Sequence, residues 1–137
     1  MARQIFITEK DKKRLLALIS ETKEFGKGNK EYLKALEQEL ELAQEVVTEL
    51  VPNDVITMNS KVCLRDLESG EDMVFTLVYP HEANIKADKI SILAPVGTAI
   101  LGFSIGDVIT WNVPDGLLNL QVIDILYQPE AAGDLDL

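Results

Sequence analysis

The chain has 137 residues, a formal net charge of −10, a hydrophobic fraction of 47% and a single cysteine, Cys63. This length suits one ordinary domain, or a small domain with a helical appendage, and the hydrophobic fraction excludes general disorder. One cysteine excludes an internal disulfide, and we find neither a signal peptide nor an apolar run of about 20 residues. We therefore expect a cytoplasmic protein with no membrane partner.

The negative charge is concentrated in the C-terminal part, because residues 1–50 carry −1 and residues 51–137 carry −9. An acidic surface repels phosphate backbones, so we expect no direct binding to free nucleic acid. Solubility explains such a charge in the simplest way, and attraction to a basic protein surface is the second explanation.

A first helix is predicted to begin at a capping pair, Thr8 and Asp11, and to end at Phe25, after a short extended segment over 3–8. Its apolar residues share one face: Leu15, Leu18 and Ile19. The next four residues, Gly26-Lys-Gly-Asn29, have the chemistry of a chain reversal, because glycine reaches positive φ and asparagine caps a following helix. The pattern predicts a helical hairpin with its tip near Lys27.

A second helix is predicted over 33–50 from a 3-4-3-4-3 apolar spacing, the seam of a coiled coil. The seam consists of Leu33, Leu36, Leu40, Ala43, Val47 and Leu50. The short reversal favours antiparallel packing on the first helix. An intermolecular coiled coil is the alternative, although sustained pairing usually needs about three to four heptads and this seam has fewer.

Beyond Pro52 the apolar period changes to two, which predicts strands over 61–67, 73–79, 89–93, 107–113 and 117–127. A short helix begins at Pro95 and stops at Gly102, and Pro114-Asp-Gly116 is a turn between the last two strands. The apolar phase shifts near Val122, which indicates a bulge. The predicted fold class is α+β, with an antiparallel helical hairpin over 1–52 and an antiparallel sheet with one short helix over 53–137.

The residues provide little catalytic chemistry. His81 is the only histidine and lies in a polar loop, and Cys63 has no identifiable base. The pair Gly26 and Gly28 does not follow a strand, so it fails the test for a phosphate-binding loop. Trp111 alternates within a strand and is expected to pack there. We therefore expect no enzyme, no metal and no cofactor.

Two sets of motifs carry a resemblance to a known family. The stretch 91–116 resembles the C-terminal domain of the Gre transcript-cleavage factors. Four segments are more similar to the Rnk family, the regulators of nucleoside diphosphate kinase: Asp54-Val-Ile-Thr-Met-Asn-Ser60, Thr76-Leu-Val-Tyr-Pro80, Ala94-Pro-Val-Gly97 and Tyr127-Gln-Pro-Glu-Ala-Ala-Gly-Asp134. The resemblance implies an FKBP-like C-terminal domain and binding to bacterial RNA polymerase near its secondary channel.

The hairpin tip departs from the Gre pattern. Glu24-Phe-Gly26 and Asn29-Lys-Glu-Tyr32 match the two ends of the Gre tip, but only Lys27 and Gly28 stand between them. The missing acidic residues are the family's means of holding a second Mg²⁺ in the polymerase, and a hard cation needs oxygen ligands. We therefore expect no stimulation of transcript cleavage. The alternative is a surviving cleavage factor that uses Glu24 and Glu31.

The leading hypothesis is a non-catalytic, monomeric regulator that binds RNA polymerase in competition with Gre factors. Pro95, Val96 and Ile100 match the Gre motif and are the expected docking contacts, with helix start and core packing as the alternative explanation. A peptidyl-prolyl isomerase, suggested by the FKBP-like fold, is the second hypothesis, although fold does not imply activity.

Overall fold

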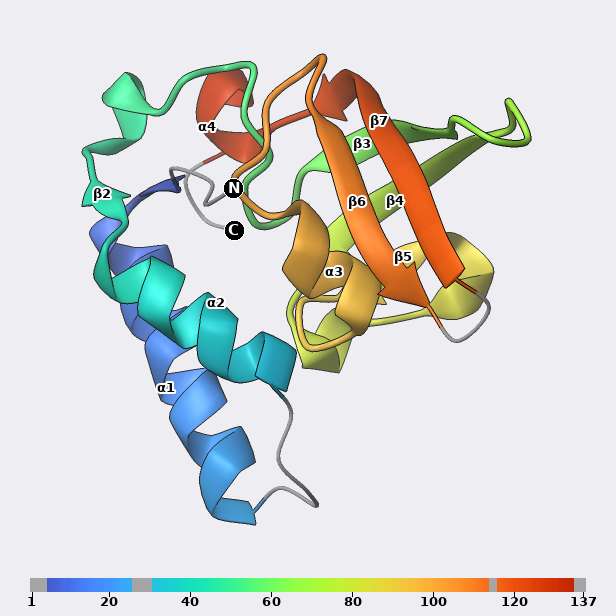
Figure 1. Ribbon diagram of the computed structural model, residues 1–137. Helices are drawn as coiled ribbons and strands as arrows, with labels where there is room; N and C mark the ends of the chain where they lie inside the picture. The colour runs from blue at the N-terminus through green and yellow to red at the C-terminus, as the bar shows by residue number, and fades with distance from the viewer. Residues whose placement is uncertain (1–4, 26–30, 114–115, 135–137) are drawn as a thin grey trace.

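The computed structural model describes residues 5–25, 31–113 and 116–134. A hairpin of two helices lies beside a five-stranded sheet, and a short helix lies between them (Figure 1). Among the described helices, none is long and apolar enough to cross a membrane.

The hairpin consists of α1 (Glu9–Phe25) and α2 (Glu31–Glu41). The Thr8 hydroxyl oxygen accepts a 3.3 Å hydrogen bond from the backbone N–H of Asp11, which confirms the predicted cap. The apolar residues of the two helices that are buried in the core are Leu15, Ile19, Leu33, Leu36 and Leu40. The first half of the predicted seam therefore packs as expected.

The predicted helix over 33–50 is wrong beyond Glu41. In the second half of the seam, Ala43 is partly buried against the core, whereas Val47 and Leu50 are exposed. The backbone N–H of Gln44 donates to the carbonyl of Ile5 at 2.8 Å, and that of Val46 donates to Ile7 at 2.9 Å. These bonds pair β2 (Gln44–Glu45) with β1 (Phe6–Ile7) in parallel, and a 3-10 turn, η1 (Thr48–Leu50), follows. The N-terminal strand thus competes with the helical hydrogen bonds and ends the helix.

The sheet has the strand order β5-β4-β3-β7-β6. Its strands are β3 (Lys61–Asp66), β4 (Asp72–Val78), β5 (Lys89–Ser91), β6 (Val108–Val113) and β7 (Gly116–Tyr127). Three neighbouring pairs are antiparallel, but β5 runs parallel to β4, which corrects the expectation of an antiparallel sheet. The connection through η2 (Pro80–Glu82) and η3 (Ile85–Ala87) brings the chain back before β5 begins.

The bulge predicted near Val122 is confirmed. Along β3, Cys63 pairs with Asp124 and the next residue, Leu64, pairs with Val122, so Ile123 has no partner in the register. One extra residue inverts the side-chain alternation of a strand, which is the phase shift seen in the sequence.

Two short helices complete the fold, α3 (Pro95–Ile100), which was predicted, and α4 (Pro129–Ala132), which was not. Glycine is required in α3, because a Cβ on Gly97 would lie 2.2 Å from the backbone carbonyl oxygen of Ser91. Gly102 ends this segment at φ +85°, as its predicted stop role requires.

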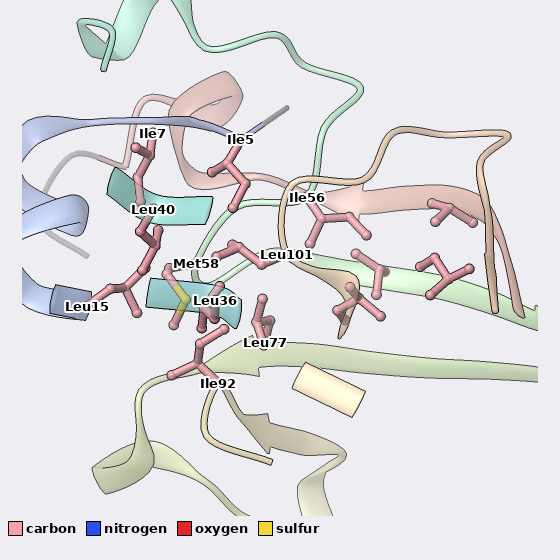
Figure 2. Close-up of a cluster of buried hydrophobic side chains, with 14 of the residues drawn as sticks. Ile5, Ile7, Leu15, Leu36, Leu40, Ile56, Met58, Leu77, Ile92 and Leu101 are labelled. Atoms are coloured by element: carbon pink, nitrogen blue, oxygen red, sulfur yellow. The ribbon is translucent and has the colours of Figure 1, made fainter. Parts of the chain in front are cut away.

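One continuous hydrophobic core joins the hairpin to the sheet (Figure 2). Leu15 and Leu36 of the hairpin lie beside Met58 and Ile92 of the C-terminal part. The other labelled members are Ile5, Ile7, Leu40, Ile56, Leu77 and Leu101. Because the two parts share a core, the hairpin projects from the sheet in a fixed direction.

Candidate protein-interaction site

The hairpin tip is only partly within the described residues. Glu24 belongs to the last turn of α1 and Glu31 is the first residue of α2. The expected tip residues Gly26, Lys27, Gly28 and Asn29 lie outside the described residues. Their role remains a prediction from the sequence.

The expected docking helix, α3, lies between α2 and the sheet (Figure 1). Pro95 occupies the first position of the helix, and Val96 is half-buried against the core. Ile100 is fully buried and has no accessible surface. Ile100 therefore packs in the core, so the docking hypothesis keeps only Pro95 and Val96.

Buried polar groups hold α3 against the sheet. The Thr98 hydroxyl donates a 2.6 Å hydrogen bond to the carbonyl of Ile92, and Thr98 is 3% exposed. Together with the close approach of Gly97 to Ser91, this bond fixes the helix on β5. Val96 therefore lies on a helix that is fixed against the sheet.

A second polar connection joins the hairpin to the C-terminal part. The Tyr79 hydroxyl, at the end of β4, donates a 2.8 Å hydrogen bond to the Asp11 carboxylate of α1, and both residues are buried. Burial raises the pKa of Asp11, and the hydrogen bond from Tyr79 opposes that rise. The guanidinium of Arg14 lies 5.9 Å from the centre of the Tyr79 ring and supplies a compensating positive charge.

A third connection holds the C-terminal helix α4. The Thr57 hydroxyl donates a 2.7 Å hydrogen bond to Glu130 and lies 2.9 Å from the hydroxyl of Ser60. Burial raises the pKa of Glu130, and the bond from Thr57 opposes it. The Gln128 side-chain amide donates to the carbonyls of Pro52 and Val55 at 2.8 and 2.7 Å.

Residue patterns could not identify Asp11, Tyr79 and Glu130 as a structural group, because their partners are far apart in the sequence. One signal was present. The segments 54–60 and 127–134 were singled out independently by resemblance, and the bond from Thr57 to Glu130 joins them.

A groove of about 610 Å³ lies beside the Asp11–Tyr79 connection. It is lined by Arg14, Ala17, Leu18, Glu21, Asn59, Tyr79, Pro80, His81 and Glu82. The His81 Nε2 atom lies 3.7 Å from the Glu82 Oε1 atom, and the His81 ring stacks beside the Tyr79 ring. Cys63 lies in β3, and burial raises the pKa of its thiol. Among the described residues, no group of three or more His, Cys, Asp or Glu is placed to hold a metal ion.

This architecture, a helical hairpin on a five-stranded sheet, is that of a Gre-type factor. A solved structure described as a prokaryotic transcription elongation factor GreA/GreB from Nitrosomonas europaea is similar, with a TM-score of 0.76 and 38% identity. The alignment covers 90% of this chain and 98% of that chain. The family model for the C-terminal part of the transcription elongation factors GreA/GreB matches residues 51–127, and the model for the Rnk N-terminus matches residues 3–46.

Relatives in sequence agree with this match. The regulator of nucleoside diphosphate kinase from Escherichia coli (strain K12) is 48% identical over 101 residues, which are 73% of this chain and 74% of that protein. The transcription elongation factor GreA from Thermotoga sp. (strain RQ2) is 32% identical over 82% of this chain and 76% of its own length. The chain therefore belongs to the Rnk family, the regulators of nucleoside diphosphate kinase, which share the Gre-factor fold.

Proposed function

We propose that this protein is a non-catalytic transcription regulator that binds bacterial RNA polymerase near the secondary channel and competes there with Gre factors. The observation that carries the proposal is a Gre-like body whose hairpin tip has Lys27 and Gly28 in place of the acidic residues of the Gre tip. The body supports docking, and the altered tip removes the carboxylates that a hard cation would need.

The short length of the hairpin supports a role in which its tip does not reach deep into the channel. At about 1.5 Å per residue, the 17 residues of α1 span about 25 Å and the 11 residues of α2 about 16 Å. By resemblance, the Gre factors have a long coiled coil, and the apolar seam of this chain is shorter; α2 ends at Glu41. A hairpin of this length, fixed by the shared core, would occupy the channel entrance without reaching as far as a Gre tip.

The docking surface in this proposal is the part of α3 around the half-buried Val96, with Pro95 at the start of the helix. Short helices that carry an accessible apolar residue on a rigid support suit protein contacts, and the polymerase would supply the complementary apolar surface. The acidic surface of the C-terminal part, which carries most of the charge of −10, would steer the protein toward basic regions of the polymerase.

The E. coli relative is named as a regulator of nucleoside diphosphate kinase. We extend this role to the present chain as an effect exerted through transcription in the cytoplasm. Measuring the transcript level and the enzyme activity of nucleoside diphosphate kinase in cells with and without this protein separates the routes. A change in activity at constant transcript and enzyme levels would contradict the transcriptional route.

A binding competition tests the proposal. The protein, labelled with a fluorophore, is mixed with purified RNA polymerase, and an unlabelled Gre factor is then added. We expect an anisotropy increase on binding and its reversal by the Gre factor. Stable binding that survives a saturating excess of Gre factor would contradict competition, and no binding would contradict the proposal as a whole.

A further inference from the structure

A short segment near the end of the hairpin exposes apolar side chains that a soluble protein normally buries. Leu42, Val47 and Leu50 are 82%, 60% and 68% exposed. They make up three of the nine large hydrophobic residues exposed among the described residues, and they fall within nine consecutive positions. We call residues 41–50 the linker strip. A concentration of exposed apolar side chains of this kind marks interaction surfaces.

The linker strip has a defined backbone conformation. It lies between Leu40 and Val51, both buried, and β2 within it is hydrogen-bonded to the N-terminal strand β1. The backbone N–H of Leu50 donates to the carbonyl of Val47 at 2.9 Å within the 3-10 turn. The backbone that carries the exposed side chains is therefore ordered before any partner binds, which lowers the entropic cost of association.

The charge of the segment is uniform in sign. No Lys or Arg occurs between residues 35 and 60, and the exposed residues Glu41, Glu45 and Glu49 alternate with the apolar ones. Lys13 of α1 lies near enough to Glu45 for that carboxylate to contribute to its raised pKa, although its ion pair is with Glu9 at 2.7 Å. Lys13 therefore offsets part of the negative charge of Glu45.

This charge selects among possible occupants. A second copy of the chain would place the same carboxylates against one another, in a protein that already carries −10. An anionic membrane surface or a nucleic acid would be repelled for the same reason. A basic protein segment with apolar residues satisfies both features, since it covers the leucine and valine side chains and pairs with the glutamates.

We propose that the linker strip is a docking surface for a basic amphipathic segment of a partner protein. Its apolar residues cover Leu42, Val47 and Leu50, and its Lys or Arg residues pair with Glu41 and Glu49. Figure 1 places β2 at the edge of the molecule opposite β5 and β6, with α2 between it and α3. The surface is thus separate from the α3 face and leaves that face open to a second partner.

The test uses the full chain, labelled with ¹⁵N, and a synthetic amphipathic peptide of about 15 residues made of Leu and Lys, a length at which isolated helices are marginal. We expect chemical-shift changes confined to residues 41–50 and their neighbours in β1. The triple substitution Leu42→Ser, Val47→Ser, Leu50→Ser should weaken binding about tenfold or more. The matched control Leu67→Ser, Ile85→Ser, Leu126→Ser removes as many exposed apolar side chains elsewhere and should leave the affinity unchanged.

A charge variant keeps the proposal testable if the triple substitution disturbs folding. The double substitution Glu41→Gln, Glu49→Gln should weaken binding of the peptide. The double substitution Glu68→Gln, Glu71→Gln, at the β3–β4 turn, should leave binding unchanged. Shift changes spread over the acidic sheet, or equal losses in the control variants, would show non-specific attraction and overturn the proposal. Self-association of the unmodified chain that the triple substitution abolishes would also overturn it, because a second copy would then be the occupant. None of these outcomes depends on polymerase binding.

Discussion

The Tyr79 hydroxyl and the Asp11 carboxylate are 68 positions apart in the chain and form a buried 2.8 Å hydrogen bond. This bond joins the first turn of α1 to the end of β4. Since the hairpin and the sheet also share one core, the bond fixes the hairpin orientation through a directional contact as well as through packing.

Tyr79→Phe should therefore destabilise the protein. The substitution leaves the buried Asp11 carboxylate without its strongest donor, and such losses cost about 1–3 kcal/mol. The free energy of unfolding in urea measures the effect. Tyr127→Phe is the matched control, because Tyr127 makes the same kind of bond to Asp134 in an exposed position and should cost much less. Equal losses in the two variants would mean that the buried hydrogen bond contributes no more to the free energy of unfolding than the exposed one.

The burial of Asp11 and Glu130 predicts a pH dependence of stability. Burial raises the pKa of both carboxyl groups, and the charge of Asp11 adds to the rise at Glu130. The folded state therefore binds more protons than the unfolded state, so the contribution of these groups is fully present below their unfolded pKa values, about 4, and is lost as pH rises through the folded values.

The Asp11→Asn variant isolates this effect, because asparagine keeps an acceptor for Tyr79 but does not titrate. Relative to this variant, the unmodified protein should lose stability as pH rises from the unfolded carboxyl pKa of about 4 through the raised pKa of Asp11 in the folded state. Urea unfolding at several pH values provides the comparison. A stability difference that does not change with pH, or that changes in the opposite direction, would contradict the assignment.

Gly97→Ala should damage the support of α3. A Cβ at this position would lie 2.2 Å from the Ser91 carbonyl oxygen, which is a backbone atom and cannot rotate away. We expect a loss of about 3 kcal/mol in stability. Gly70→Ala is the control, since its Cβ would have open space and only the positive φ opposes it, at a cost of about 1 kcal/mol. Thermal unfolding of both variants measures the two losses in stability. A loss in Gly97→Ala no larger than that in Gly70→Ala would contradict the prediction.

Val96→Ser tests the proposed polymerase contact on α3. If Val96 is buried by the polymerase, its loss should weaken binding about tenfold, as expected for a central apolar contact. Leu117→Ser, at an exposed position of β7, is the control and should bind normally. Unchanged polymerase affinity in the Val96 variant, with the fold intact by circular dichroism, would remove α3 from the docking surface.

The features of the fold that could be predicted from the sequence are those that depend on neighbouring residues. Features that depend on contacts between distant segments could not be predicted. The Thr8 cap and the Val122 bulge are local features. Both were predicted correctly because each depends on a pattern that spans only a few neighbouring residues. The end of α2 was missed because the apolar spacing continues to Leu50. Helix propensity and spacing carry no information about the competing strand, Phe6–Ile7, that pairs with residues 44–45.

The candidate site shows the same division. Pro95 and Val96 were predicted from a local motif, and Ile100 was grouped with them because spacing alone does not say which face of a short helix is inward. The connections of Asp11 with Tyr79 and of Thr57 with Glu130 depend on the tertiary structure and leave no periodic pattern. The significance of Lys27 and Gly28 came from comparison with the Gre pattern.

The central claim is that this protein occupies RNA polymerase without stimulating RNA cleavage. The most direct measurement follows transcript cleavage in backtracked elongation complexes, with this protein alone, with a Gre factor alone, and with both. We predict no cleavage above background with this protein alone and progressive inhibition of Gre-stimulated cleavage as it is added. Cleavage by this protein alone, or undiminished Gre activity at saturating concentrations of it, would contradict the claim.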